Sequence, residues 1–197
     1  MRLGIFGGSF DPPHVGHLLA AVDAFDALQL DRLIFVPAAT QPFKAGQPNT
    51  PGHLRLAMLQ LMVGTDPRFE VSPVEIERDG LSYTVETLTA FAGQYPAAER
   101  FFLIGADAFA AFGQWREPRR ITQLARVAVL QRAGEEPGAL PAGVDPAAVT
   151  WLPTRRVDVS STEVRERVRQ GRAIRGFVSD AVAEFIATSG LYQSRGA

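Results

Sequence analysis

Two histidines near the N-terminus, His14 and His17, are the residues of this sequence best suited to binding an anion. They end the segment GIFGGSFDPPHVGH, residues 4–17, in which an apolar run breaks at two glycines and passes through a rigid turn into a helical pattern. Strand, glycine-rich turn and helix is the order in which α/β folds build a phosphate site. Imidazoles three residues apart at a helix start share one face, beside unpaired N–H groups and the positive end of the helix dipole. The spacing therefore predicts an anion-binding site.

The same segment lacks the features of other phosphate and metal motifs. No lysine closes a G-x-x-x-x-G-K run, and Gly4, Gly7 and Gly8 have the wrong spacing for G-x-G-x-x-G. Zinc takes three or four protein ligands, whereas the chain has no cysteine and one further histidine, His53. We therefore predict no metal site built by the protein. A structural role, in which the two histidines only cap a turn, stays open.

The composition is that of one globular domain, residues 1–197, long enough to bury a substantial core. A net charge of −1 argues against broad affinity for nucleic acid or membranes, although a local basic pocket remains compatible with it. No apolar run approaches the roughly 18–20 residues that span a bilayer, and the N-terminus lacks the pattern of a secretion signal. A cytoplasmic protein is expected, and the sequence leaves open whether it forms a homo-oligomer.

Apolar runs typical of strands alternate with helical patterns along the chain. Strands are expected at residues 3–6, 33–36, 69–71, 100–104, 126–130 and 149–152, and helices at 18–28, 52–63, 83–93 and 180–188. The alternation predicts an α/β fold with an open, Rossmann-like parallel sheet flanked by helices. Ligands bind such sheets at the carboxyl ends of their strands.

A second helix start near the C-terminus, in the segment VDVSSTEVR, also carries groups that bind anions. Ser160 and Glu163 have the spacing of a capping box, which predicts a helix start on local chemistry alone. Capping is therefore a sufficient explanation for these residues. A helix N-terminus that carries Ser161, Thr162 and Arg165 is nevertheless also suited to an anion.

Three further side chains lie where ligands are expected. Lys44, the single lysine of the chain, follows the second strand, where it is either a phosphate contact or a solvated loop residue. Asp107 follows the strand at 100–104 and is placed to accept hydrogen bonds from ribose hydroxyls. Trp115 lies in the polar sequence GQWREPRR, where a stacking role competes with a core role.

With these motifs the chain resembles the nucleotidylyltransferase superfamily. Its HVGH segment matches the (T/H)-x-G-H element of the superfamily, and VSSTEVR matches I-S-S-T-x-I-R with valine for both isoleucines. The segments GSFDPPHVGH, PFK, SYTVETL, FLIGADAF and VSSTEVR follow the order found in the bacterial nicotinate-nucleotide adenylyltransferases, over nearly the whole chain. The resemblance implies transfer of AMP from ATP to nicotinate mononucleotide, giving nicotinic acid adenine dinucleotide and pyrophosphate, with Mg²⁺ accompanying ATP.

The resemblance also implies a role for each matching residue. Binding of the triphosphate, and with it catalysis, is implied for His14, His17 and Arg165, with Ser161 and Thr162 as further ATP contacts. Gly8, Ser9 and Phe10 are expected to form the wall of the ATP site. Gly105 and Asp107 are expected to lie near the ribose of ATP. For the mononucleotide, Thr84 is expected to orient the carboxylate, Trp115 to stack on the pyridine ring, and Lys44 and Arg132 to meet the phosphate.

The chain departs from this family at residues 41–44. The usual run is P-P-H-(K/R), whereas here it is Gln-Pro-Phe-Lys, so a histidine contact is absent and the hold on the mononucleotide phosphate is expected to be weaker. The sequence leaves two alternatives: a phosphopantetheine adenylyltransferase, whose usual motif is T-N-G-H, and a module that binds ATP without turnover. A tRNA-linked synthetase is disfavoured because the chain has no anticodon domain.

Overall fold

The computed structural model describes residues 1–44, 46, 49–132, 134, 138–142 and 144–193. Within them, six strands form one sheet in the order β3-β2-β1-β4-β5-β6, and every neighbouring pair is parallel. The strands are β1 (Arg2–Gly8), β2 (Arg32–Pro37), β3 (Phe69–Val71), β4 (Glu99–Gly105), β5 (Arg126–Arg132) and β6 (Val149–Thr154). The expected Rossmann-like α/β fold is confirmed.

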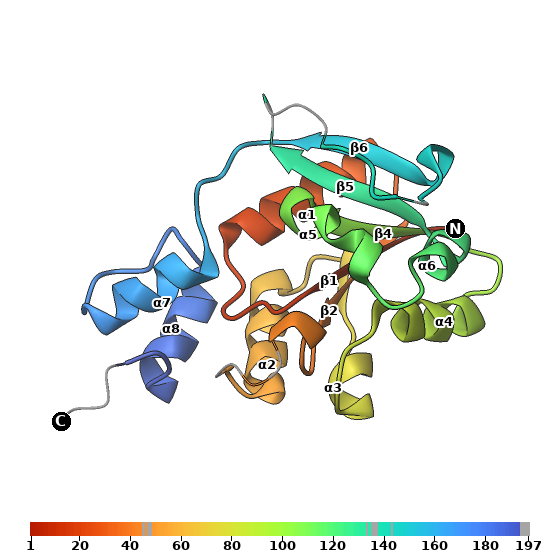
Figure 1. Ribbon diagram of the computed structural model, residues 1–197. Helices are drawn as coiled ribbons and strands as arrows, with labels where there is room; N and C mark the ends of the chain where they lie inside the picture. The colour runs from red at the N-terminus through yellow and green to blue at the C-terminus, as the bar shows by residue number, and fades with distance from the viewer. Residues whose placement is uncertain (45, 47–48, 133, 135–137, 143, 194–197) are drawn as a thin grey trace.

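Helices connect the strands (Figure 1). They are α1 (Val15–Ala27), α2 (Gly52–Val63), α3 (Val74–Arg78), α4 (Thr84–Gln94), α5 (Ala106–Ala110), α6 (Pro118–Leu124), α7 (Ser161–Arg169) and α8 (Asp180–Ser189). Short 3₁₀ turns are η1 (Pro42–Lys44), η2 (Phe112–Gln114) and η3 (Pro146–Ala148). None of the helices in the described ranges is long and apolar enough to cross a membrane.

Two apolar cores cover the two faces of the sheet, because successive strand residues point to opposite sides. One core takes Leu33 and Phe35 from β2 and packs them against α1, α2, α7 and α8. The other takes Ile34 and Val36 from the same strand and packs them against α4, α5 and α6. In Figure 1, α7 and α8 lie beside α2 at one end of the molecule, away from α4 and α6.

The direction in which strands are added to the sheet reverses between β1 and β4, and this reversal positions the site. The chain winds from β1 toward β3 on one side and continues from β4 toward β6 on the other. Connections leave the carboxyl ends of β1 and β4 in opposite directions, which opens a crevice between them. The β1–α1 turn with its histidines and the segment after β4 therefore border the same crevice.

Helix α3 was not predicted from the sequence. Its five residues lie between Pro73, which is its N-cap, and a turn at Asp79 and Gly80 with positive φ at both. A helix of little more than one turn has too few positions to show a period of 3.6 residues. It carries Glu75, a buried residue that borders the site.

Candidate active site

Two adjoining cavities open at the carboxyl edge of the sheet. The polar cavity, of about 520 Å³, is lined by Ser9, Phe10, Asp11, His17, Thr40, Gln41, Asn49, Ser161, Thr162 and Arg165. The apolar cavity, of about 710 Å³, is lined chiefly by Gly8, Phe43, Glu75, Ser82, Tyr83, Thr84, Gly105, Gln114, Trp115 and Arg116. Gln41 lines both, so the cavities are neighbours.

The two histidines form a stacked pair at the start of α1. Their ring centroids lie 3.7 Å apart with an angle of 30° between the planes. The backbone N–H of His14, the N-cap residue, donates to Nδ1 of His17 at 3.2 Å. An Nδ1 that accepts carries no proton, so the neutral His17 ring carries its proton on Nε2. Nε2–H of His17 is thus left as a hydrogen-bond donor at the polar cavity, which His17 lines.

Burial favours the neutral form of both imidazoles. Burial lowers the pKa of His14 to about 4. Burial, reinforced by the neighbouring His14, lowers the pKa of His17 well below its ordinary value. In the free protein His17 therefore presents a fixed N–H dipole to the polar cavity and not a formal positive charge.

Gly16 makes room for this pair. A Cβ at residue 16 would lie 3.0 Å from Nδ1 and 3.1 Å from Cε1 of His14. Such a contact is tighter than nine in ten real Cβ contacts, so an alanine would require the His14 ring to shift by a few tenths of an ångström. The close approach of the His14 ring therefore favours glycine at this position of the HVGH segment.

The first turn of α7 is bonded to the turn between β1 and α1. Ser161 Oγ donates to the carbonyl of Pro12 at 2.8 Å, and Arg165 Nη1 donates to the carbonyl of Asp11 at 2.6 Å. The predicted cap is confirmed, because Ser160 Oγ accepts from the backbone N–H of Glu163 at 3.1 Å. The two helix starts that the sequence singled out thus border one cavity.

Asp11 is held at the floor of the polar cavity by a residue from the far end of the chain. The hydroxyl of Tyr192 donates to Asp11 Oδ1 at 2.6 Å, and the backbone N–H of Thr50 approaches Oδ2 at 3.3 Å. Burial, followed by the hydrogen bond to Asp11, raises the pKa of Tyr192, so its hydroxyl keeps its proton. No pattern around residue 192 signals this contact.

Arg55, on α2, is the largest side chain that is fully buried in the described structure, with 1% of its surface exposed. Its guanidinium donates to three backbone carbonyls: Thr50 at 2.8 Å, Ser9 at 2.8 Å and Ala39 at 3.2 Å. These carbonyls belong to the segment before α2, the turn after β1 and the loop after β2. One side chain therefore joins three segments around the polar cavity.

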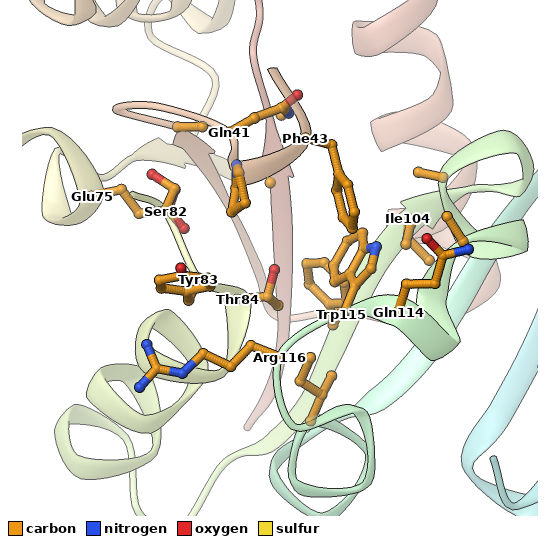
Figure 2. A pocket seen from close by; sticks show the side chains of 18 of the residues that line it. Gln41, Phe43, Glu75, Ser82, Tyr83, Thr84, Ile104, Gln114, Trp115 and Arg116 are labelled. Atoms are coloured by element: carbon orange, nitrogen blue, oxygen red, sulfur yellow. The ribbon is translucent and has the colours of Figure 1, made fainter. Parts of the chain in front are cut away.

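In the apolar cavity, Trp115 is fixed on one side and open on the other. Its indole packs against Phe112 and Phe102, with centroids 5.5 and 6.0 Å away, and is only half-buried. Across the cavity, α4 starts at Thr84 after the N-cap Tyr83, whose side chain makes no capping bond. Backbone donors at this helix start are left without a side-chain partner. Figure 2 shows Tyr83 and Thr84 facing Trp115 across the opening.

Ser82 links the two walls of the apolar cavity. It precedes the N-cap of α4 without capping that helix, and its Oγ accepts from the backbone N–H of Ala39 at 2.9 Å. It also contacts the buried Glu75, whose Oε1 accepts from Thr87 at 2.6 Å. Burial raises the pKa of Glu75, and the hydrogen bonds from Thr87 and Ser82 oppose that rise. The loop after β2 is thereby fixed to α3 and α4.

The predicted site residues divide between the two cavities. Six line the polar cavity: Ser9, Phe10, His17, Ser161, Thr162 and Arg165. Four line the apolar cavity: Gly8, Thr84, Gly105 and Trp115. His14 is buried behind His17, and Asp107 is exposed in the first turn of α5. The side chains of Lys44 and Arg132 lie outside the described part of the structure, so their predicted roles stay untested.

Curated relatives cover almost the whole chain. A family model described as cytidylyltransferase-like matches residues 5–167. A probable nicotinate-nucleotide adenylyltransferase from Gemmatimonas aurantiaca is 50% identical over 197 residues, covering 98% of this chain and 93% of the relative. One from Thermus thermophilus is 44% identical over 193 residues, covering 98% of this chain and all of the relative.

Solved structures share the fold. The nicotinic acid mononucleotide adenylyltransferase of Plasmodium falciparum complexed with NaAD superposes with a TM-score of 0.74 at 16% identity, covering 97% of both chains. The same protein complexed with APC gives a TM-score of 0.75 at 15% identity, covering 97% of this chain and 96% of the other. At such identities the superposition shows a common architecture.

Proposed function

The chain belongs to the cytidylyltransferase-like superfamily and, within it, to the nicotinate-nucleotide adenylyltransferase family, and on that premise we propose that it transfers AMP from ATP to nicotinate mononucleotide. The products would be nicotinic acid adenine dinucleotide and pyrophosphate. The observation that supports this most directly is the pair of adjoining cavities, one rich in donors and one aromatic, that share Gln41. We also propose that residues 1–197 act as a single domain, because both cavities lie on the same sheet.

The triphosphate of ATP would occupy the polar cavity. Nε2 of His17 supplies one neutral donor, and Thr162 and Arg165 supply a hydroxyl and a guanidinium from the start of α7. The hydroxyl of Ser161 already donates to the carbonyl of Pro12, so Ser161 would contribute through its backbone N–H at the helix start. His14 would act through His17, because its ring holds that imidazole in place. These donors are fixed before the substrate arrives, so they need little reorganisation as charge builds on the phosphates.

Nicotinate mononucleotide would occupy the apolar cavity. Its ring would lie on the open face of Trp115, and its carboxylate would face the donors at the start of α4 near Thr84. Lys44 and Arg132 remain the proposed contacts for its phosphate. A phosphate at the junction near Gln41 would then be directed toward the ATP in the polar cavity.

The reaction requires one bond to form and one to break. An oxygen of the mononucleotide phosphate attacks the α-phosphorus of ATP, and the bond from that phosphorus to the bridging oxygen of the β-phosphate breaks. The protein orients the two nucleotides in line and stabilises the charge that moves onto the departing pyrophosphate. A proton need not be removed from the nucleophile, because the phosphate is already an anion at pH 7.

Mg²⁺ is proposed to enter with ATP. Asp11 is the acidic residue that lines the polar cavity, but both its carboxylate oxygens already accept hydrogen bonds. In the described ranges, no three His, Cys, Asp or Glu side chains cluster closely enough to hold a metal ion. These residues fit an ion held mainly by substrate phosphates and water, as is usual for Mg²⁺. When bound, the ion would neutralise phosphate charge.

Pyrophosphate release tests the proposed function. Purified protein is incubated with ATP and Mg²⁺ together with nicotinate mononucleotide, nicotinamide mononucleotide or phosphopantetheine in parallel reactions. Release with nicotinate mononucleotide, and formation of the dinucleotide, is the expected result. Release with phosphopantetheine alone would assign the rival transferase, and ATP binding without release in any reaction would assign a non-catalytic module.

Substituting Trp115 by alanine is expected to raise the KM for nicotinate mononucleotide roughly ten-fold or more while leaving the KM for ATP unchanged. Stacking of a base on an aromatic side chain contributes about 1–3 kcal/mol, and losing a contact present before and during reaction raises KM more than it lowers kcat. Steady-state kinetics with each substrate varied in turn measures the split. An unchanged KM for the mononucleotide would remove Trp115 from the site.

A further inference from the structure

Phe43 is an apolar residue whose exposed side chain is not part of either core of the fold. It lies in η1 and leaves 60% of its surface exposed, the largest value among the large hydrophobic residues described as exposed. A single exposed apolar residue is ordinary on a protein surface. Phe43 differs because it lines the apolar cavity. Figure 2 shows its ring directed from the loop after β2 toward Trp115.

The loop that carries Phe43 is fixed at its base. The backbone of Ala39 is bonded on its N–H by Ser82 and on its carbonyl by Arg55, and Thr40 accepts from the N–H of Ser82 at 2.8 Å. Trp115, the other ring, is braced by Phe102 and Phe112. The two aromatic side chains are therefore presented to the cavity from anchored segments on opposite sides of the crevice, one following β2 and one following β4.

The substrate named in the proposed function has the chemistry to use both rings. In a pyridine mononucleotide the ring nitrogen is bonded to ribose, so the flat ring carries a positive charge. Aromatic faces attract such a cation, by about 0.5–1 kcal/mol at exposed sites and about 2 kcal/mol or more when water is excluded. Arg116, the cation lining this cavity, is already engaged, with Nη1 2.9 Å from Glu86 and its guanidinium 4.6 Å above the Tyr83 ring.

We propose that Phe43 provides a second aromatic contact, beside Trp115, for the cationic ring of the nucleotide substrate. This inference rests on the proposed function. It revises the expectation that residues 41–44 only weaken the hold on the substrate, because the side chain at position 43 faces the ring site and not the polar cavity. The apolar surface of Phe43 is exposed to water in the free protein, and the bound substrate ring would bury part of that surface.

Fluorescence gives a binding test that does not depend on turnover. The chain has two tryptophans, so Trp151→Phe leaves Trp115 as the single reporter. In this background, titration with nicotinate mononucleotide without ATP is expected to quench the emission. Adding Phe43→Ala is expected to raise the Kd about five- to ten-fold, and Phe43→Leu, which keeps apolar area without an aromatic face, is expected to raise it by most of that amount. Phe43→Tyr is expected to keep the Kd.

The control is Leu140→Ala, which removes another exposed apolar side chain, 38% exposed and not among the residues that line either cavity, and is expected to leave the Kd unchanged. An unchanged Kd in Phe43→Ala would overturn the proposal. An unchanged Kd in Phe43→Leu would overturn it too, because it would show that the contribution of Phe43 to binding comes from its apolar area and not from its aromatic face. These results leave the proposed function standing if the parent still binds the mononucleotide and releases pyrophosphate. Failure of the parent in both assays would instead overturn the proposed function, and this inference with it.

Discussion

Substituting His17 by alanine is expected to lower kcat by about 10²–10³-fold, the range measured when one pre-oriented donor to a developing negative charge is removed. The His14 N–H bond to Nδ1 leaves the proton on Nε2, and burial keeps the ring neutral. The ring is also packed edge-on against Phe10, with centroids 4.9 Å apart, so its direction is fixed. The loss should fall on kcat more than on the KM for ATP, because the donor matters most as charge reaches the leaving pyrophosphate.

Two further variants separate this role from a structural one. His17→Gln keeps a neutral N–H donor and is expected to recover part of the loss, which a requirement for a positively charged imidazolium would not allow. His53→Ala is the matched control, since His53 is an exposed histidine on α2 outside both cavities. A fall in kcat of less than ten-fold in His17→Ala would show that the imidazole only packs.

The parts of the site that could be predicted from the sequence are those encoded within a few residues. His14 and His17 share a face because they are three residues apart at a helix start, and the cap at Ser160 follows from the spacing to Glu163. The strands were also predictable, because a buried parallel strand is a short apolar run. In each case one local rule determines the outcome.

The donors at the start of α1 show where a local rule is insufficient. The helix start predicted free backbone N–H groups beside the histidines, but the N–H of Val15 donates to the carbonyl of Phe177 at 2.9 Å, and that of His14 donates to His17. The segment before α8 takes up the first, and an imidazole takes up the second. The side chain of His17 therefore presents a donor in place of these two N–H groups.

Arg55 was missed although the sequence holds a signal for it. It lies on one helical stripe with Met58, Leu59 and Met62, the buried residues of α2, so its spacing alone places it on the buried face. A charged residue among apolar residues on one helix face is normally interpreted as an exposed residue that interrupts the apolar pattern. Its partners, the carbonyls of Ser9 and Ala39, lie 46 and 16 residues away and meet it only when the chain is folded.

Replacing Arg55 by methionine is expected to lower the free energy of unfolding by about 2–4 kcal/mol. A carbonyl that loses its donor and stays out of reach of water costs roughly 1–3 kcal/mol. Three partly buried carbonyls lose their donor here, and water can satisfy part of that loss. Removing the charge offsets part of that cost, because burial already disfavours the guanidinium, as its lowered pKa indicates. The carbonyl term is larger, so a net loss is expected. Urea unfolding of the parent and the variant measures it.

A second readout follows from where those carbonyls lie. Ser9 lines the polar cavity and Ala39 precedes Thr40, which lines it too, so loosening these segments is expected to raise the KM for ATP as well as lower stability.

Arg55→Lys keeps the charge but loses the planar guanidinium, so it should resemble Arg55→Met if hydrogen-bond geometry is what matters. Arg169→Met, which removes an exposed arginine paired with Glu166 at 3.1 Å, is the control and should change the free energy of unfolding by no more than about 0.5 kcal/mol. Equal effects at the two arginines, or full activity and stability in Arg55→Lys, would contradict the assignment of Arg55 as the residue that positions the walls of the polar cavity.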